Sequence, residues 1–170
     1  MGRFTGAVES QAAQPAGTPS GTTFNGYFAA MVAGSAANFK LRRCTLGVRA
    51  ASAPPTSQQV TVAIYRQSVR VAGTGFSTVT MQNLDPRGAA SAVTGIDVTT
   101  AATAGTTGPT IGANSIGKKT FNTQQGWDIP YELMEEMICD QGTANGVAFV
   151  NIGIALPAGH LFTLEIEEEE

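Results

Sequence analysis

One glycine-rich segment carries a lysine at the spacing that phosphate chemistry uses. Residues Gly112, Gly117 and Lys118 match the first seven positions of a phosphate-binding loop, in which backbone amides and a lysine hold phosphate groups. Lys119 occupies the eighth position, where a serine or threonine would bind magnesium. No apolar strand precedes Gly112, and the residues after Lys119 are poor helix formers. We therefore interpret this segment as a glycine-rich loop with two solvated lysines, and we expect no nucleotide cofactor.

The residue types that most often act as catalysts or metal ligands are sparse in this chain. His160 is the only histidine, and no second histidine, carboxylate pair or nucleophile elbow accompanies it in the sequence. Cys44 and Cys139 are far apart and lack the paired spacing of a zinc site or a disulfide framework. We expect both cysteines to be reduced and buried. The sequence thus predicts a protein that is not an enzyme and that uses no catalytic residue, cofactor or metal.

The chain ends in a run of like charges. Five carboxylates fall within the last six residues: Glu165, Glu167, Glu168, Glu169 and Glu170. Such charges repel one another unless a cation or a basic surface neutralises them. A solvated tail and a strand that docks on a partner both fit this pattern. A metal pocket is disfavoured, because a run at one strand end does not bring its oxygens together around an ion.

Basic residues gather in the other half of the chain. Residues 1–70 hold seven Lys or Arg and one acid, whereas residues 71–170 hold three bases and twelve acids, for a net charge of −3. The candidate interaction residues of the basic half are Arg42, Arg43, Arg49, Arg66 and Arg70. They form either dispersed surface charge or a patch that meets the acidic ends of neighbouring copies or an oppositely charged lattice. Nucleic acid is disfavoured as a partner, because the bases are scattered and the total charge is acidic.

The chain is long enough for one domain with a real core. It has 170 residues, of which 42% are hydrophobic and only 14% charged, against a usual charged fraction near ~25%. Such a weakly charged surface suits a component of an assembly. No apolar run approaches the ~20 residues that span a bilayer, and the first residues lack the apolar core of a secretion signal. We expect no membrane partner.

Alternating apolar residues predict a series of short strands. The pattern is present at 24–32, 39–49 and 60–65, and more weakly at 76–84 and 92–99. Between Arg42 and Arg43 the alternation slips by one residue, which predicts a β-bulge that could aim both arginines outward. Residues 150–156 and 162–166 alternate around the turn residues 157–160 and predict a β-hairpin.

Three segments depart from this pattern. Residues 1–23 are small, polar and rich in proline and glycine, and we predict an extended arm that lies on a neighbour. Residues 100–126 are predicted to form a long surface loop. Asp128 and Pro130 begin a predicted short helix that ends near Gly142, with Leu133, Met134, Met137 and Ile138 on its apolar face and Glu135 and Glu136 solvated. The predicted fold is an all-β, jelly-roll-like antiparallel sandwich over residues 24–170, with an N-terminal arm and at most one short helix.

Several short segments carry a resemblance to a known group of proteins. They are YRQS at 65–68, NLDPRGAAS at 83–91, TGPTIG at 107–112, Trp127, and GTANG at 142–146 followed by the segment up to Glu170. In this order they resemble small jelly-roll structural proteins of tailed bacteriophages, of the capsid decoration or cement type. The region 131–139 departs from that likeness, because it has a helical pattern rather than that of a continuous strand.

The resemblance implies a non-enzymatic virion protein on the outer surface of the capsid, made in the host cytoplasm. Its partners would be the major capsid protein lattice and other copies of itself, with a homotrimer favoured. Extended arms would bridge capsid subunits, which makes Arg3 and Phe4 further candidate interaction residues. The alternative is a tail, baseplate or fibre module that binds a host-surface glycan or another virion protein. That function would need an exposed aromatic platform from Trp127 and Tyr131, whereas the simpler interpretation places Trp127 in the core.

Overall fold

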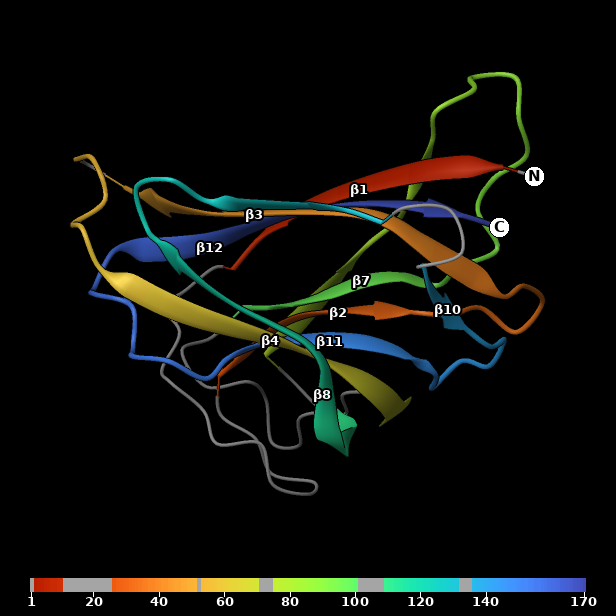
Figure 1. The fold of residues 1–170 in the computed structure, drawn as a ribbon. Coiled ribbons are helices and arrows are strands. Elements are labelled where there is room, and N and C mark those ends of the chain that lie inside the picture. The colour runs from red at the N-terminus through yellow and green to blue at the C-terminus, as the bar shows by residue number, and fades with distance from the viewer. Residues whose placement is uncertain (1, 11–25, 52, 71–74, 101–108, 132–135) are drawn as a thin grey trace.

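Two antiparallel sheets pack face to face and enclose one main core (Figure 1). The computed structural model describes residues 2–10, 26–51, 53–70, 75–100, 109–131 and 136–170. Within these residues every regular element is a strand. The predicted all-β sandwich is therefore confirmed.

The first sheet contains the two ends of the chain. Its strands lie in the order β10 (Met137–Cys139), β3 (Phe39–Ala50), β12 (His160–Glu169), β1 (Arg3–Glu9) and β6 (Gln82–Asn83), with β9 (Trp127–Pro130) also paired to β3. The first and last strands are thus direct neighbours, from Arg3 opposite Glu169 to Glu9 opposite Thr163. Both termini lie at the same end of the sandwich (Figure 1).

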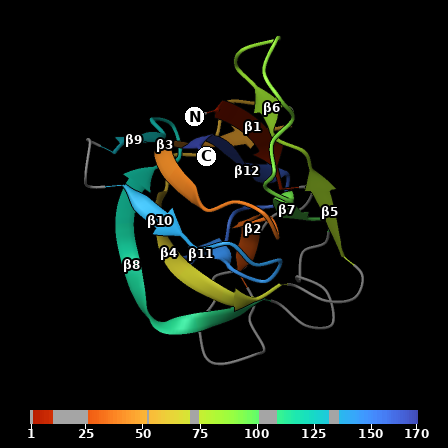
Figure 2. The same ribbon diagram turned by 90° about the vertical axis from the view of Figure 1, so that its right-hand side faces the viewer.

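The second sheet has a short strand at one edge and a long one at the other. Its order is β5 (Phe76–Val79), β7 (Gly95–Thr99), β2 (Tyr27–Val32), β11 (Gly146–Asn151), β4 (Gln59–Val69) and β8 (Thr110–Asn122). Figure 2 shows β8 at the margin of the molecule, outside β4.

The core forms where the period-two pattern turns apolar side chains inward. Along β12, Phe162, Leu164 and Ile166 are buried while Glu165 between them is exposed. Phe162 stacks on Phe28 of the opposite sheet, with ring centroids 4.3 Å apart. Burial of each such side chain contributes about 1.5–3 kcal/mol, so these contacts hold the two sheets together.

The predicted bulge in β3 is confirmed. Pairing with β12 passes from Arg43 opposite Glu167 to Leu41 opposite Glu168, which leaves Arg42 as the extra residue. The bulge keeps Leu41 and Cys44 on the buried face although two residues, rather than one, separate them. Arg42 and Arg43 both reach acidic groups outside the core.

The prediction of an N-terminal arm was wrong for residues 3–9. They form β1, which lies between β12 and β6, and Phe4 is a buried core residue rather than a contact for a neighbour. Alternate burial of Phe4, Gly6 and Val8 explains the strand, but the small residues around them weakened the pattern in the sequence. Residues 11–25 of the predicted arm lie outside the described residues.

The prediction of a long loop at 100–126 was wrong for its second half. Residues 110–122 form β8, the longest strand among the described residues. Its glycines, asparagines and lysines have weak strand propensity, so pairing with β4 decides the conformation. Residues 101–108 lie outside the described residues.

The helix predicted beyond Asp128 was wrong at both ends. Residues 127–130 and 137–139 are the short strands β9 and β10, which pair with β3. Of the apolar residues that suggested a helical face, Met137 packs against the core from the sheet edge and Ile138 is exposed. Residues 132–135 lie outside the described residues.

The predicted C-terminal hairpin was also wrong. β11 belongs to the second sheet and β12 to the first, so residues 152–159 cross between the sheets. Asn151 ends β11, where its side-chain amide donates to the carbonyl of Ile154 at 2.8 Å and its carbonyl accepts from Gly153. Ile154, predicted as a strand residue, is exposed.

Candidate functional site

The acidic end of β12 is the part of the chain where the predicted interaction residues come together. The glutamates do not form a free tail, because β12 runs between β1 and β3 as far as Glu169. Glu165 is exposed, whereas Glu168 and Glu169 are buried. The acidic run is thus a strand that docks within its own sheet.

Arg42 neutralises part of this run. Its Nε and Nη2 atoms donate to Oε2 of Glu169 at 3.0 and 2.7 Å, and its Nη1 donates to Glu136. Arg3 lies more loosely against the same carboxylate, at 4.0 Å, and its side chain is largely exposed. The bulge in β3 therefore places one largely buried guanidinium between two carboxylates that are far apart in the sequence.

Arg43 forms the second contact. Its guanidinium donates to both oxygens of Asp128 at 2.9 and 2.7 Å, and the Thr45 hydroxyl donates to the same carboxylate at 3.0 Å. The pKa of Asp128 is lowered, and the main cause is the hydrogen bonding from Arg43, which favours the charged carboxylate. Glu167 lies 3.9 Å from the same guanidinium. These groups are solvent-exposed, so the contact fixes geometry more than it adds stability.

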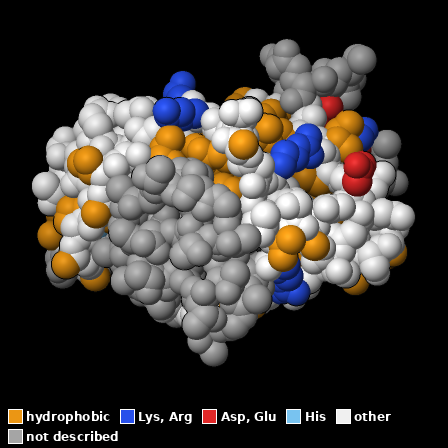
Figure 3. All heavy atoms as spheres, turned by 90° about the horizontal axis from the view of Figure 1, so that it is seen from below, with side chains coloured by type: hydrophobic (Ala, Val, Ile, Leu, Met, Phe, Trp, Pro, Cys, Tyr) orange, Lys and Arg blue, Asp and Glu red, His pale blue; other side chains and the backbone are white. Residues whose placement is uncertain are grey.

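The remaining arginines also find partners within the chain. Arg49 pairs with Glu9 across the first sheet, and Arg66 donates to the carbonyl of Ile138. Arg70 donates to both oxygens of Asp97 at 2.7 Å, and Thr78 donates to the same carboxylate at 2.6 Å. Figure 3 shows Lys and Arg scattered over the side of the second sheet rather than gathered in one patch. The interpretation as dispersed charge therefore describes these residues better than a common basic surface does.

Glu168 differs from the other glutamates because it points into the sandwich. It lies opposite Phe4 on one side and Leu41 on the other, both core residues, and its carboxylate oxygens make no hydrogen bond among the described residues. Burial raises the pKa of Glu168 to about 8, and the negative charge of Glu170 adds to this effect. Glu170 itself accepts hydrogen bonds from the Ser91 hydroxyl at 2.5 Å and from the amides of Ala92 and Val93.

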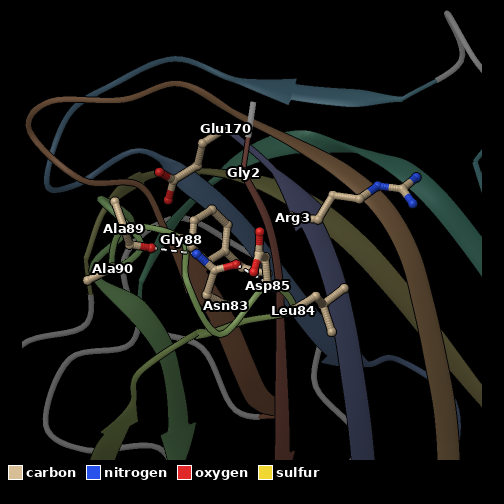
Figure 4. A pocket seen from close by; sticks show the side chains of 10 residues that line it. Gly2, Arg3, Asn83, Leu84, Asp85, Gly88, Ala89, Ala90 and Glu170 are labelled. Atoms are coloured by element: carbon tan, nitrogen blue, oxygen red, sulfur yellow. Dashed lines mark hydrogen bonds between the residues drawn. The ribbon is translucent and has the colours of Figure 1, made fainter.

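An open pocket of about 690 Å³ lies beside Glu170 (Figure 4). Its lining consists of residues 2–4 at the start of β1, the segments 83–85 and 88–90, and Glu170. The Asn83 amide donates to the Ala89 carbonyl at 2.6 Å, and its carbonyl accepts from the amide of Asp85. Arg3 extends away from the pocket in Figure 4. The pocket's amide and carboxylate groups thus mainly shape the loop after β6.

The groups considered for catalysis lie apart and serve packing. His160 is buried at the start of β12, where Nε2 accepts a hydrogen bond from the amide of Thr56 at 3.1 Å. Both cysteines are buried and free, as predicted, and burial raises the pKa of the Cys139 thiol to about 11. Within the described ranges, no group of three or more His, Cys, Asp or Glu side chains is arranged to hold a metal ion. Trp127 and Tyr131 are half-buried and pack against the edge of the core, which is closer to the core interpretation of Trp127 than to an exposed platform.

The segment that resembled a phosphate-binding loop is part of β8. Only Ile111 and Phe121, near its two ends, are buried, and residues 112–116 and 118–120 are exposed. Lys118 and Lys119 form no ion pair with any residue that the structure describes. These lysines fall within the loop predicted at 100–126 and are not among the candidate interaction residues. The adjacent lysines are the sequence signal for an edge strand, because lysine is common on exposed sheet edges.

Comparisons with known proteins do not add a family to this description. No protein-family model, curated protein or solved structure matches the chain. In the part of the chain that the structure covers, no helix has the length and apolar character needed to cross a membrane.

Proposed function

We propose that this protein is a non-enzymatic structural component of a tailed-phage virion, namely a capsid decoration protein. It binds the outer surface of the major capsid protein lattice across subunit boundaries, as a homotrimer. The observation that carries the proposal is β8, a long edge strand that is exposed on both faces and whose two lysines form no ion pair within the described part of the chain. A strand with so little burial of its own gains stability when another surface covers it.

The arginine–carboxylate pairs support the same function. Because Arg42, Arg49 and Arg70 are bound to carboxylates of other strands, these ion pairs fix the strands of the sandwich relative to one another. A rigid body of this kind loses little conformational entropy when it docks on a lattice. A protein that binds only the assembled shell then stabilises that shell by mass action.

The test is co-sedimentation of the purified protein with empty, expanded shells of the phage that encodes it. We expect saturable binding, greater shell resistance to heat, and a trimer mass for the isolated protein in solution. The control is the unexpanded shell, which we expect to bind less. Absence of binding to either shell contradicts the proposal.

The alternative is a tail, baseplate or fibre module that binds a host-surface glycan. One observation favours it: a pocket of about 440 Å³ is lined by Trp127, Asp128, Gln124 and Gln125, which offer the hydrogen-bonding groups that sugars use. The packing of Trp127 against the core weighs against it, because the ring is then less available for stacking. Antibody labelling of intact particles separates the two functions by locating the protein on the head or on the tail.

A further inference from the structure

We propose that β8 accepts an acidic, extended segment of a partner protein as an added strand along Gly117–Asn122. The inference rests on the proposed function, in which this segment belongs to the capsid lattice. It names the chemistry of the partner and the part of this chain that receives it.

Among the described residues, the backbone of β8 has a strand partner on one side only. β8 is the last strand of its sheet and pairs only with β4, so one row of its N–H and C=O groups has no strand partner among the described residues. From Gly117 opposite Ile64 to Asn122 opposite Gln59 the pairing advances without a shift. The register irregularities are confined to the part of β8 before Gly117. Residues 117–122 therefore provide a regular edge to which a strand can add, except at the carbonyl of Asn122, which accepts hydrogen bonds from the amides of Gln125 and Gly126.

The two lysines define the charge of that strand. Lys118 lies opposite Ala63 and Lys119 opposite Val62, and directly opposed residues share one face of a sheet. Val62 belongs to the core between the sheets, whereas Ala63 belongs to the apolar cluster on the outer face. The lysines thus point to opposite faces. An added strand meets both of them when it carries two consecutive acidic residues, because consecutive side chains also point to opposite faces.

Charge argues against a second copy of this chain as the occupant. Two β8 edges facing each other would bring four lysines to one interface, and no carboxylate of β8 would offset them. The acidic strand of the chain, β12, is paired on both sides within its own sheet. A partner protein with an exposed acidic segment fits the edge better. Lysines on an edge also deter neutral strands, so the same residues favour an acidic one.

The first experiment measures binding of a synthetic peptide. The probe is a labelled peptide in which threonine and valine alternate around a central Glu-Glu pair, and the matched control peptide carries Gln-Gln instead. We expect fluorescence anisotropy to show binding of the Glu-Glu peptide, weaker binding of the control, and a loss of affinity as salt is raised. Equal binding of the two peptides, or binding of neither, overturns the proposal.

Protein variants locate the binding edge. We expect the double variant Lys118→Glu with Lys119→Glu to bind the Glu-Glu peptide about tenfold more weakly than the wild type. The control is Arg87→Glu, which reverses an exposed charge away from β8 and should bind as the wild type does. Thermal unfolding of each variant checks that the sandwich is intact. A double variant that keeps full affinity overturns the proposal.

Hydrogen exchange separates an added strand from side-chain contact alone. We expect bound peptide to slow exchange of backbone amides within Gly117–Asn122 and to leave β5, the opposite edge, unchanged. Peptide binding without this protection overturns the strand addition.

Binding of other partners separates the remaining alternatives. If a single-stranded oligonucleotide binds as tightly as the Glu-Glu peptide and the double variant loses this binding, the proposal is overturned and the surface is a general polyanion site. If the double variant still binds expanded shells, the inference fails while the proposed function stands; if wild-type protein binds the peptide but no shell, the function fails alone.

Discussion

Glu168 is the residue whose environment conflicts most with its charge. It occupies a core-facing position of β12 at the end of the row Phe162, Leu164 and Ile166, where an apolar side chain would follow the pattern. The buried carboxyl is best accommodated in its protonated form, because desolvation penalises the anion. Its neighbours Glu169 and Glu170 are both acidic and oppose ionisation further.

This environment predicts a pH-dependent stability. The pKa of Glu168 is raised from 4.5 to about 8 in the folded protein, so the folded state binds the proton more tightly than the unfolded state. The resulting stabilisation is fully present below 4.5 and is lost as the pH rises through about 8. We expect Glu168→Gln to have a smaller loss of unfolding free energy over this range and to exceed the wild type in stability at its alkaline end. Denaturant unfolding at a series of pH values measures this difference.

The matched control for this prediction is Glu165→Gln. Glu165 lies on the same strand but is exposed, so its replacement should leave the pH dependence of the wild type unchanged. A Glu168→Gln variant with the same pH profile as the wild type would show that Glu168 is not the group responsible.

At the scale of the element, the bulge in β3 decides which side chains reach the core. Before the bulge, Phe39 and Leu41 face inward, and after it Cys44 and Leu46 do. One extra residue, Arg42, lets both pairs of apolar side chains face the core while β3 stays paired with the uninterrupted strand β12. The slip in alternation made this feature predictable from the sequence alone, since a period-two pattern shows any inserted residue.

Deletion of Arg42 should therefore cost far less than deletion of a paired residue of the same strand. Without Arg42 the strand is regular, and Phe39, Leu41, Cys44 and Leu46 all keep facing the core; the main loss is that of the contacts to Glu136 and Glu169. Deletion of Lys40 instead makes Phe39 and Leu41 adjacent, so that one of them turns away from the core, with a loss of roughly 2–5 kcal/mol of stability. Urea unfolding of the two deletion variants compares these costs, and Arg42→Ala is the control that removes the side-chain contacts alone. Equal destabilisation by the two deletions would contradict the assignment of Arg42 as the extra residue.

The weaker elements show where sequence reasoning failed. The sequence did not predict β8, because its middle residues are small or polar and show no alternation of apolar and polar side chains. β9 and β10 were read as a helix because their few apolar residues also fit a helical spacing. In each case the strand exists because a longer strand, β4 or β3, supplies the hydrogen-bonding partner.

At the scale of the whole molecule, the first sheet joins both ends of the chain. β1 lies between β12 and β6, and the Ser10 side chain accepts a hydrogen bond from the amide of Phe162. Removal of β1 would expose an edge of β12 and withdraw Phe4 and Val8 from the core. The charge segregation along the sequence has its structural counterpart here, because the bases of β3 lie beside the acids of β12.

A truncation that removes residues 1–10 tests this arrangement. We expect the truncated protein to lose cooperative unfolding and to bind a hydrophobic dye, because the sheet loses an interior strand. Circular dichroism during heating and dye fluorescence measure the two effects. Arg3→Ala is the control, since this side chain is largely exposed, and it should unfold as the wild type does. A truncated protein with unchanged thermal unfolding would return these residues to the role of a peripheral arm.

The sequence by itself determined the fold class, the bulge and the burial of both cysteines. These features follow from local spacing: alternation of apolar residues, a slip of one residue in that alternation, and thiols without ligand partners. Only the tertiary structure decided where the acidic strand docks, which arginines are already paired, and which edge of a sheet stays open. Those outcomes depend on contacts between residues far apart in the chain, such as Arg42 with Glu169 or Arg70 with Asp97, and local periodicity carries no information about which distant strands become neighbours.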